Sequence, residues 1–231
     1  MKHKGKLIVI EGVDGCGKET QTKRLYERFR EAGQKVMTIS YPRYDKESSA
    51  MVKLYLSGAF GENPEDVSPY IASTFYTADR YASYKEDYEV FLNNGGIVLM
   101  DRYTTSNMVH QAGKIRDSHA RKQFLAWLWD YEFKLFGLPI PDQVFFLNIP
   151  PAVNQKLIEN RKNKMTGNAE KDIHEKSPEH LNDAYMSALA LVDEYAWIEI
   201  RCISKGELRS IEDIHEEIWN YLNIKEDNTD A

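Results

Sequence analysis

The sequence is poor in cysteine, with only Cys16 and Cys202 among its 231 residues. Two cysteines cannot build the disulfide framework of a small secreted protein, and this usage fits a reducing compartment. Long apolar runs are also lacking. The first one follows a basic N-terminus and stops at Ile10, which is too short for a secretion signal or a membrane span. We therefore expect a cytoplasmic protein with no membrane contact.

An excess of positive charge is missing as well. The net charge is −6, and Lys and Arg are interspersed with Asp and Glu along the chain. A basic face for a nucleic-acid polymer is therefore not expected, whereas a nucleotide needs only a local basic pocket. Internal repeats and low-complexity segments are lacking too. The length suits one domain, which we expect over residues 1–231.

Short apolar runs alternate with helical patterns along the whole chain. The expected strands span residues 7–10, 35–40, 97–100, 144–149 and 197–200. The expected helices span residues 23–29, 48–58, 68–92, 118–136, 152–160, 178–195 and 210–222. This alternation predicts an α/β fold, a three-layer sandwich in which helices cover both faces of a mostly parallel five-stranded sheet. In such sheets, ligands bind beyond the carboxyl ends of the strands.

A glycine-rich motif directly follows the first expected strand. Its spacing, G-x-x-x-x-G-K, runs from Gly12 to Lys18 and leads into a helical pattern. Strand, loop and helix in this order are the context of a phosphate-binding loop, whose amides and helix terminus hold phosphate oxygens. Lys18 is expected to reach the β- and γ-phosphates of ATP. The expected ATP-binding residues are Gly12, Val13, Asp14, Gly15, Cys16, Gly17, Lys18, Glu19 and Thr20.

One position departs from the phosphate-loop pattern. Glu19 stands where the motif has a Ser or Thr that holds Mg²⁺, and Thr20 comes one residue late. A carboxylate also binds Mg²⁺, but it adds negative charge beside the polyphosphate. Asp101, at the end of the third expected strand, is a second ligand candidate. We expect Mg²⁺ as cofactor, held either by Glu19 or by Asp101 and water while Glu19 turns away.

Cations for phosphoryl transfer are placed near the expected strand ends. Arg43 and Arg102 follow the second and third strands, and Arg80 lies one helical turn after Tyr76. Guanidinium groups match phosphate oxygens, and an aromatic ring beside one suits a nucleoside monophosphate. The polar segment at about 160–172 is rich in Lys and Arg and is expected to act as a closing lid.

Taken together, these motifs resemble thymidylate kinases over nearly the whole chain. The opening E-G-x-D-G-x-G-K, the F-Y-T-A-D-R segment ending at Arg80, the D-R-Y triplet ending at Tyr103 and the basic lid occur in the order and spacing of that family. The resemblance implies a nucleoside monophosphate kinase that transfers the γ-phosphate of ATP to dTMP, forming dTDP and ADP. It also implies a homodimer.

The resemblance further implies how dTMP is bound. The residue matching Asp14 contacts the deoxyribose 3′-OH, the one matching Tyr76 stacks on thymine, and the one matching Arg80 reaches a base carbonyl. Those matching Arg43 and Arg102 hold the acceptor phosphate. The implied dTMP-binding set is Asp14, Arg43, Tyr76, Arg80, Arg102, Tyr103, Ser106, Asn107 and Gln111.

Family members place a catalytic cation in one of two ways. Some carry an arginine in the glycine loop, and others have glycine there and supply the cation from the lid. Gly15 and the basic lid of this chain resemble the second, bacterial-type arrangement. The implied catalytic set is Lys18, Asp101, Arg102, Arg161 and Lys164.

Two other functions stay open. A deoxynucleoside kinase shares the glycine loop, but its acceptor has no phosphate, and Glu11 would serve as its base. A catalytically inactive nucleotide-binding regulator would have lost metal binding through Glu19. The six histidines show no recognisable metal site. His180 is expected either to be structural or to contact the base.

Overall fold

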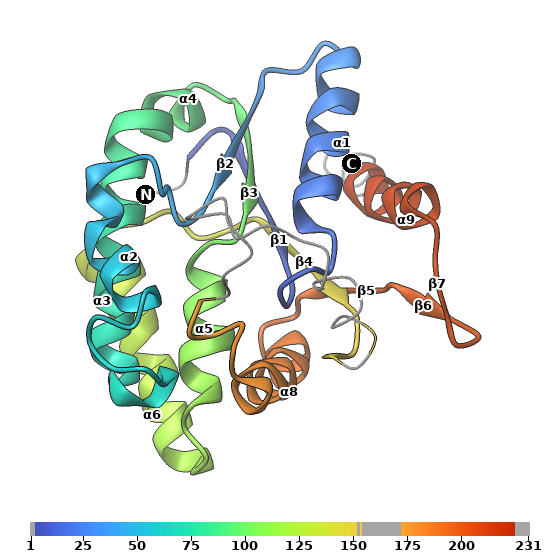
Figure 1. Ribbon diagram of the computed structural model, residues 1–231. Helices are drawn as coiled ribbons and strands as arrows, with labels where there is room; N and C mark the ends of the chain where they lie inside the picture. The colour runs from blue at the N-terminus through green and yellow to red at the C-terminus, as the bar shows by residue number, and fades with distance from the viewer. Residues whose placement is uncertain (1–2, 152, 154–171, 225–231) are drawn as a thin grey trace.

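The fold is built on one parallel sheet, seen in a computed structural model that describes residues 3–151, 153 and 172–224 (Figure 1). The strand order is β2-β3-β1-β4-β5, and every neighbouring pair is parallel. The strands are β1 (Lys6–Glu11), β2 (Val36–Ser40), β3 (Ile97–Asp101), β4 (Gln143–Asn148) and β5 (Ile198–Arg201). This arrangement confirms the expected α/β sandwich with a five-stranded sheet.

Helices cover both faces of the sheet. They are α1 (Lys18–Glu31), α2 (Ala50–Leu56), α3 (Pro69–Ser83), α4 (Glu89–Asn93), α5 (Thr104–Gly113), α6 (Ser118–Trp129), α8 (Pro178–Glu194) and α9 (Ile211–Ile224). In Figure 1, α1 and α9 lie together on one side of the sheet, and α3, α5, α6 and α8 lie on the other. A short hairpin, β6 (Ile203–Ser204) and β7 (Glu207–Leu208), precedes α9.

The central strand β1 supplies side chains to two separate cores, because successive residues of a strand point to opposite faces. Leu7 and Val9 pack in the core beneath α5, α6 and α8, whereas Ile8 and Ile10 pack in the core beneath α1 and α9. All four side chains are fully buried. A run of consecutive apolar residues is typical of a strand buried on both faces, and such burial holds the carboxyl end of β1 firmly in place.

Two expected helices are interrupted in the structure. The pattern at 68–92 forms α3, a π-helical turn at Tyr84–Tyr88 and α4, and the pattern at 118–136 forms α6 and a π-helical turn at Asp130–Leu135. Single π turns often occur where tertiary contacts demand a local change of side-chain phase. Here the second turn carries the fully buried Glu132. The expected helix at 152–160 and the lid at 160–172, with Arg161 and Lys164, lie almost wholly outside the described residues.

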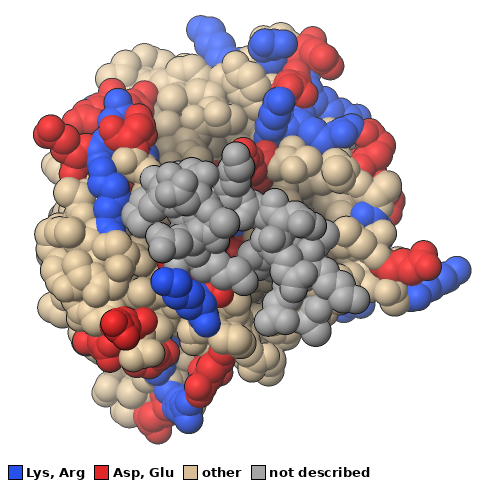
Figure 2. Space-filling view, in the orientation of Figure 1, with Lys and Arg blue, Asp and Glu red and all other residues tan. Residues whose placement is uncertain are grey.

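The surface agrees with the mixed charge pattern of the sequence. On the face shown in Figure 2, Lys and Arg are interspersed with Asp and Glu. No helix among the described residues is both long enough and apolar enough to cross a membrane.

Candidate active site

The glycine loop joins β1 to α1 through tight backbone turns. Gly17 has a φ of 93°, which L side chains rarely adopt, and a Cβ on Gly12 would lie 2.5 Å from the Cys16 sulfur. The buried Lys18 donates from Nζ to the carbonyl oxygens of Gly12 at 2.8 Å and Val13 at 2.9 Å. The loop thus holds its own lysine at the amino end of α1, where helix amides favour anions.

Arg102 lies between the glycine loop and α5. Its Nη2 donates to Asp14 Oδ1 at 2.5 Å, and its Nη1 donates to Ser106 Oγ at 3.3 Å and His110 Nε2 at 3.2 Å. The Glu11 carboxylate forms an ion pair with Arg102 Nη1 at 3.7 Å. The backbone φ of Arg102 is 69°, a left-handed conformation that costs a non-glycine residue about 1–3 kcal/mol. The side-chain contacts compensate for this strain.

Asp14 and Arg102 stabilise each other's charge. Burial alone would raise the pKa of Asp14, but the positive charges of Arg102 and Lys18 lower it well below its ordinary value. Burial alone would lower the pKa of Arg102, but the negative charges of Asp14 and Glu11 raise it above its ordinary value. Both side chains therefore stay ionised at neutral pH.

Glu11 is occupied by hydrogen bonds inside the protein. Its fully buried carboxylate accepts the Gly12 amide at 2.9 Å and the hydroxyls of Thr105 at 2.6 Å and Ser106 at 2.8 Å. These bonds tie the end of β1 to the first turns of α5, which gives Glu11 a structural role.

Arg80 forms a buried ion pair with Glu132. Its Nη2 and Nε donate to the two carboxylate oxygens at 2.7 and 2.9 Å, and its Nη1 donates to the Tyr103 carbonyl at 3.3 Å. Asn107 Nδ2 donates to the same carboxylate at 2.9 Å. All of these side chains are buried. Sequence reasoning missed Glu132, although a carboxylate between Tyr131 and Phe133 in a largely apolar helical segment is itself a signal, because such a group is rarely buried without a partner.

Arg43 is held by carboxylates away from Asp14. It donates to Asp87 at 2.6 Å, to Asp79 at 3.2 Å through Nε, and to Ser48 at 2.9 Å. It lines an open cavity beside β2, together with the two expected metal ligands, Glu19 and Asp101. The structure therefore brings the metal candidates to one cavity.

A second pocket collects the other expected acceptor residues. Eight of the nine residues that the resemblance implies for dTMP line it: Asp14, Tyr76, Arg80, Arg102, Tyr103, Ser106, Asn107 and Gln111. Only Arg43, of that set, lines the neighbouring cavity instead. Further residues that sequence reasoning did not predict also line this acceptor pocket: Tyr41, Pro42, Tyr44, Leu56, His110, Asp172 and His174.

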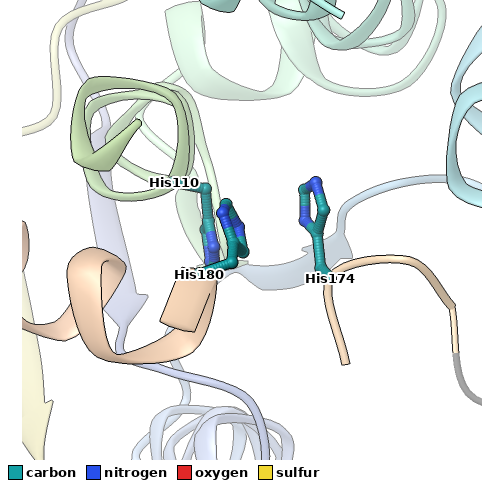
Figure 3. Close-up of side chains that lie close together, drawn as sticks. All are labelled: His110, His174 and His180. Carbon is teal, nitrogen blue, oxygen red and sulfur yellow. The ribbon is translucent and has the colours of Figure 1, made fainter. Parts of the chain in front are cut away.

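Three histidines meet at the edge of the acceptor pocket, whereas the sequence showed no recognisable metal site among its histidines. One ring nitrogen each of His110, His174 and His180 lies within 4.8 Å of the others, and all three side chains are buried. Figure 3 shows His110 on α5 close to His180 on α8 and to His174, which precedes α8. His110 lies 64 positions before His174 in the chain, so spacing could not reveal the cluster. Unlike the other two, His180 is not among the residues that line the pocket.

Burial keeps these histidines uncharged near neutral pH. It lowers the pKa of His180 to about 4, and it lowers the pKa values of His110 and His174 well below the ordinary value. The positive charge of Arg102 adds to the effect at His110.

Acidification should destabilise the protein through these histidines. In the unfolded chain a histidine titrates near about pH 6.5, so below that pH the unfolded state binds more protons. Stability is therefore fully present above about pH 6.5 and is lost as the pH falls toward the folded-state pKa of His180, about 4. The slope is at most about 1.4 kcal/mol per pH unit for each histidine. Urea unfolding at about pH 7.5 and at about pH 5 measures how much the free energy of unfolding falls between the two pH values. This decrease should be smaller in His180→Gln than in the unsubstituted protein by about 1–2 kcal/mol.

The control for this experiment is His119→Gln, because His119 is exposed on α6. This variant should lose as much stability on acidification as the unsubstituted protein does. An equal loss in His180→Gln would contradict the low folded-state pKa of His180.

Comparison with known proteins gives consistent family matches. The model of the family described as thymidylate kinase matches residues 10–218. Thymidylate kinase from Mycobacterium tuberculosis is 36% identical over 137 residues, which are 59% of this chain and 62% of that protein. The probable thymidylate kinase from Pyrococcus abyssi is 28% identical over 215 residues, or 93% of this chain and 94% of that protein.

A solved structure shares the fold. Thymidylate kinase from Candida albicans superposes with a TM-score of 0.71 at 20% sequence identity, covering 98% of this chain and 94% of that one. This likeness shows that the two chains share their fold.

Proposed function

Because the chain belongs to the thymidylate kinase family, we propose that it transfers the γ-phosphate of ATP to dTMP, forming dTDP and ADP. The observation that carries this proposal is the acceptor pocket, where eight of the nine expected dTMP residues meet beside the glycine loop. Asp14 and Arg102 connect the acceptor pocket to the glycine loop, since both line the pocket, Asp14 belongs to the loop, and the two form an ion pair. The chain spans about 62% of the length of the mycobacterial relative.

On the donor side, we propose that the glycine loop and the amino end of α1 bind the phosphates of ATP. Lys18 would exchange the carbonyls of Gly12 and Val13 for phosphate oxygens, because a charged acceptor is the stronger partner for an ammonium group. Asp101 and Glu19 line one cavity and offer the oxygen ligands that Mg²⁺ prefers. When bound, Mg²⁺ would neutralise charge on the transferred phosphate.

On the acceptor side, the pairing of Arg80 decides between two uses of its guanidinium. Arg80 and Glu132 form an ion pair without net charge, so the pair suits an uncharged base carbonyl better than a phosphate. We propose that Arg80 and Asn107 read the thymine edge, that the Tyr76 ring stacks on the base, and that Arg102 binds the acceptor phosphate.

The state of Glu11 argues against a deoxynucleoside kinase. That reaction would need a carboxylate base near the 5′-OH, whereas Glu11 is fully buried and accepts three hydrogen bonds from the protein. The ion pairs around Arg102 instead place a guanidinium beside the glycine loop, as a phosphorylated acceptor requires.

A coupled ADP-release assay with ATP and Mg²⁺ tests the proposal. We expect turnover with dTMP and none with thymidine, with dUMP as a measure of base selectivity. Turnover with thymidine but not dTMP would identify a nucleoside kinase. ATP binding without turnover on any acceptor would identify a nucleotide-binding regulator.

Glu19→Ser should keep or raise the dTMP kinase activity. The substitution restores the hydroxyl that phosphate loops commonly offer to Mg²⁺ and removes a negative charge beside the polyphosphate. Steady-state kinetics at several Mg²⁺ concentrations would measure it. A loss of more than about tenfold would show that Glu19 itself is needed for metal binding.

The remaining features are also proposals. We propose a homodimer in the cytoplasm, as family resemblance and cysteine usage suggest, and a single domain in which the segment at 160–172 closes over ATP. Arg161 and Lys164 remain the predicted lid cations, and both lie outside the described residues.

A further inference from the structure

The cluster formed by His110, His174 and His180 has the composition of a metal site. Three nitrogen ligands of one type lie within 4.8 Å of one another and come from two separate parts of the chain. One ring nitrogen in it, Nε2 of His180, is buried and hydrogen-bonds to no residue that the structure describes. Buried polar atoms normally have a partner, so this cluster suggests a ligand of its own.

The surroundings prepare the rings for coordination. Tyr55 Oη lies 2.9 Å from His174 Nε2, accepts from Lys114 Nζ at 2.8 Å, and lies 3.4 Å from the Pro64 carbonyl oxygen, to which its own proton can turn. Tyr55 can then accept the Nε2–H of His174, which leaves the Nδ1 lone pair of that ring available. Metal-ligating histidines commonly donate their second nitrogen to such a partner. Neutral imidazole is the form that binds metals.

The chemistry of the donors selects the metal. Imidazole nitrogens favour zinc and other late first-row dications, whereas Mg²⁺ prefers oxygen ligands. Three histidines bind zinc at about 2.0–2.1 Å and leave a fourth position open. In a tetrahedral site this bond length puts nitrogens roughly 3.3 Å apart, so the rings must close by about 1.5 Å or less. Side-chain torsions are the degrees of freedom that would bring the rings together.

We propose that His110, His174 and His180 form a binding site for a zinc-like dication, with its open fourth position directed at the acceptor pocket. This site is separate from the proposed Mg²⁺ position, because Asp101 and Glu19 line a different cavity. Of the charged groups that act on these rings, Asp14 is negative, whereas Arg102 and Lys114 are positive.

Metal binding competes with Arg102 for one histidine. A guanidinium only donates hydrogen bonds, so the lone pair that His110 offers to Arg102 is on Nε2. A metal that takes this lone pair displaces Arg102, and His110 and His174 line the acceptor pocket. The metal therefore reversibly excludes the acceptor nucleotide. This consequence depends on the proposed function, whereas metal binding itself does not.

The test is Zn²⁺ titration by isothermal calorimetry, using the untagged full chain without nucleotides. We expect one Zn²⁺ per chain, and binding at least about tenfold weaker in His180→Gln. His180 is the informative ligand to remove, since it is not among the residues lining the acceptor pocket. His119→Gln, which changes an exposed histidine, should bind Zn²⁺ as the unsubstituted chain does.

Co²⁺ provides a second readout on the unsubstituted protein, which keeps the test valid if His180→Gln fails to fold. A four-coordinate site made of three histidine nitrogens and a fourth ligand such as water should give strong visible absorption bands. Weak bands typical of aqueous Co²⁺, no stoichiometric Zn²⁺ binding, or equal losses in the His119 and His180 variants would each overturn the metal site.

Addition of dTMP separates this inference from the proposed function. We expect dTMP to weaken Zn²⁺ binding and Zn²⁺ to inhibit turnover in the unsubstituted chain but not in His180→Gln. Tight Zn²⁺ binding that His180→Gln abolishes, without an effect of dTMP, would support the metal site and overturn its overlap with the acceptor pocket.

Discussion

Glu132→Gln is expected to lower the free energy of unfolding by about 3–5 kcal/mol, which is the typical cost of removing one charged partner of a buried ion pair. Arg80 and Glu132 are both buried and joined by two hydrogen bonds, so glutamine would leave an uncompensated guanidinium in the core. It would also turn an amide donor toward Arg80 or Asn107. Urea unfolding at neutral pH measures the effect.

A matched control comes from an exposed pair. Glu179 forms an ion pair with Arg116 at the surface, where solvent screens the charges. Glu179→Gln, the same chemical change, should alter stability by no more than about 1 kcal/mol. A double variant, Arg80→Met with Glu132→Met, should recover part of the stability lost in Glu132→Gln, because it leaves no buried charge. Similar effects of the two glutamine substitutions would contradict the role given to Glu132.

Arg102→Gln is expected to lower kcat/KM for dTMP by about 10³-fold. Arg102 is the guanidinium that lines the acceptor pocket and contacts the glycine loop through Asp14, so glutamine removes positive charge where the two phosphates would meet. The positive charge of Arg102 stabilises the transition state more than the bound substrates, because negative charge on the transferred phosphate is redistributed during the reaction. We therefore expect kcat to fall together with kcat/KM. Steady-state kinetics with dTMP as the varied substrate measures both.

The control for this variant is Arg116→Gln, which removes an exposed arginine that pairs with Glu179. It should leave kcat/KM within about twofold of the unsubstituted value. Thermal unfolding of both variants would show whether Arg102→Gln is folded. A loss below about tenfold in a folded Arg102→Gln protein would exclude Arg102 as the main phosphate contact.

The architecture could be predicted from sequence because its signals are local. Apolar strand patterns, helical spacing and the glycine loop each depend on residues within a few positions of one another. All five expected strands form, with bounds shifted by a few residues at most. The π-helical turns at Tyr84–Tyr88 and Asp130–Leu135 were missed, because the phase change of a single widened turn is lost in an apolar pattern judged over a whole helix.

The candidate site was predictable only in part. Residues on motifs near strand ends, such as Asp14 and Arg102, meet as expected because parallel strands end at one edge of the sheet. Their partners do not follow from any motif. Arg80 lines the acceptor pocket, but its ion-pair partner Glu132, 52 positions later in the chain, was not predicted.

The sequence by itself determined the order of the strands and of most helices, the phosphate loop and most members of the acceptor pocket, because backbone preference and hydrophobic period are properties of neighbouring residues. Helix α5 was not among the expected helices. Only the tertiary structure decided which charges are paired and which rings meet. The Arg80–Glu132 pair and the cluster of His110, His174 and His180 join residues from different elements. Burial then sets their ionisation, because desolvation depends on everything packed around a group and not on its place in the chain.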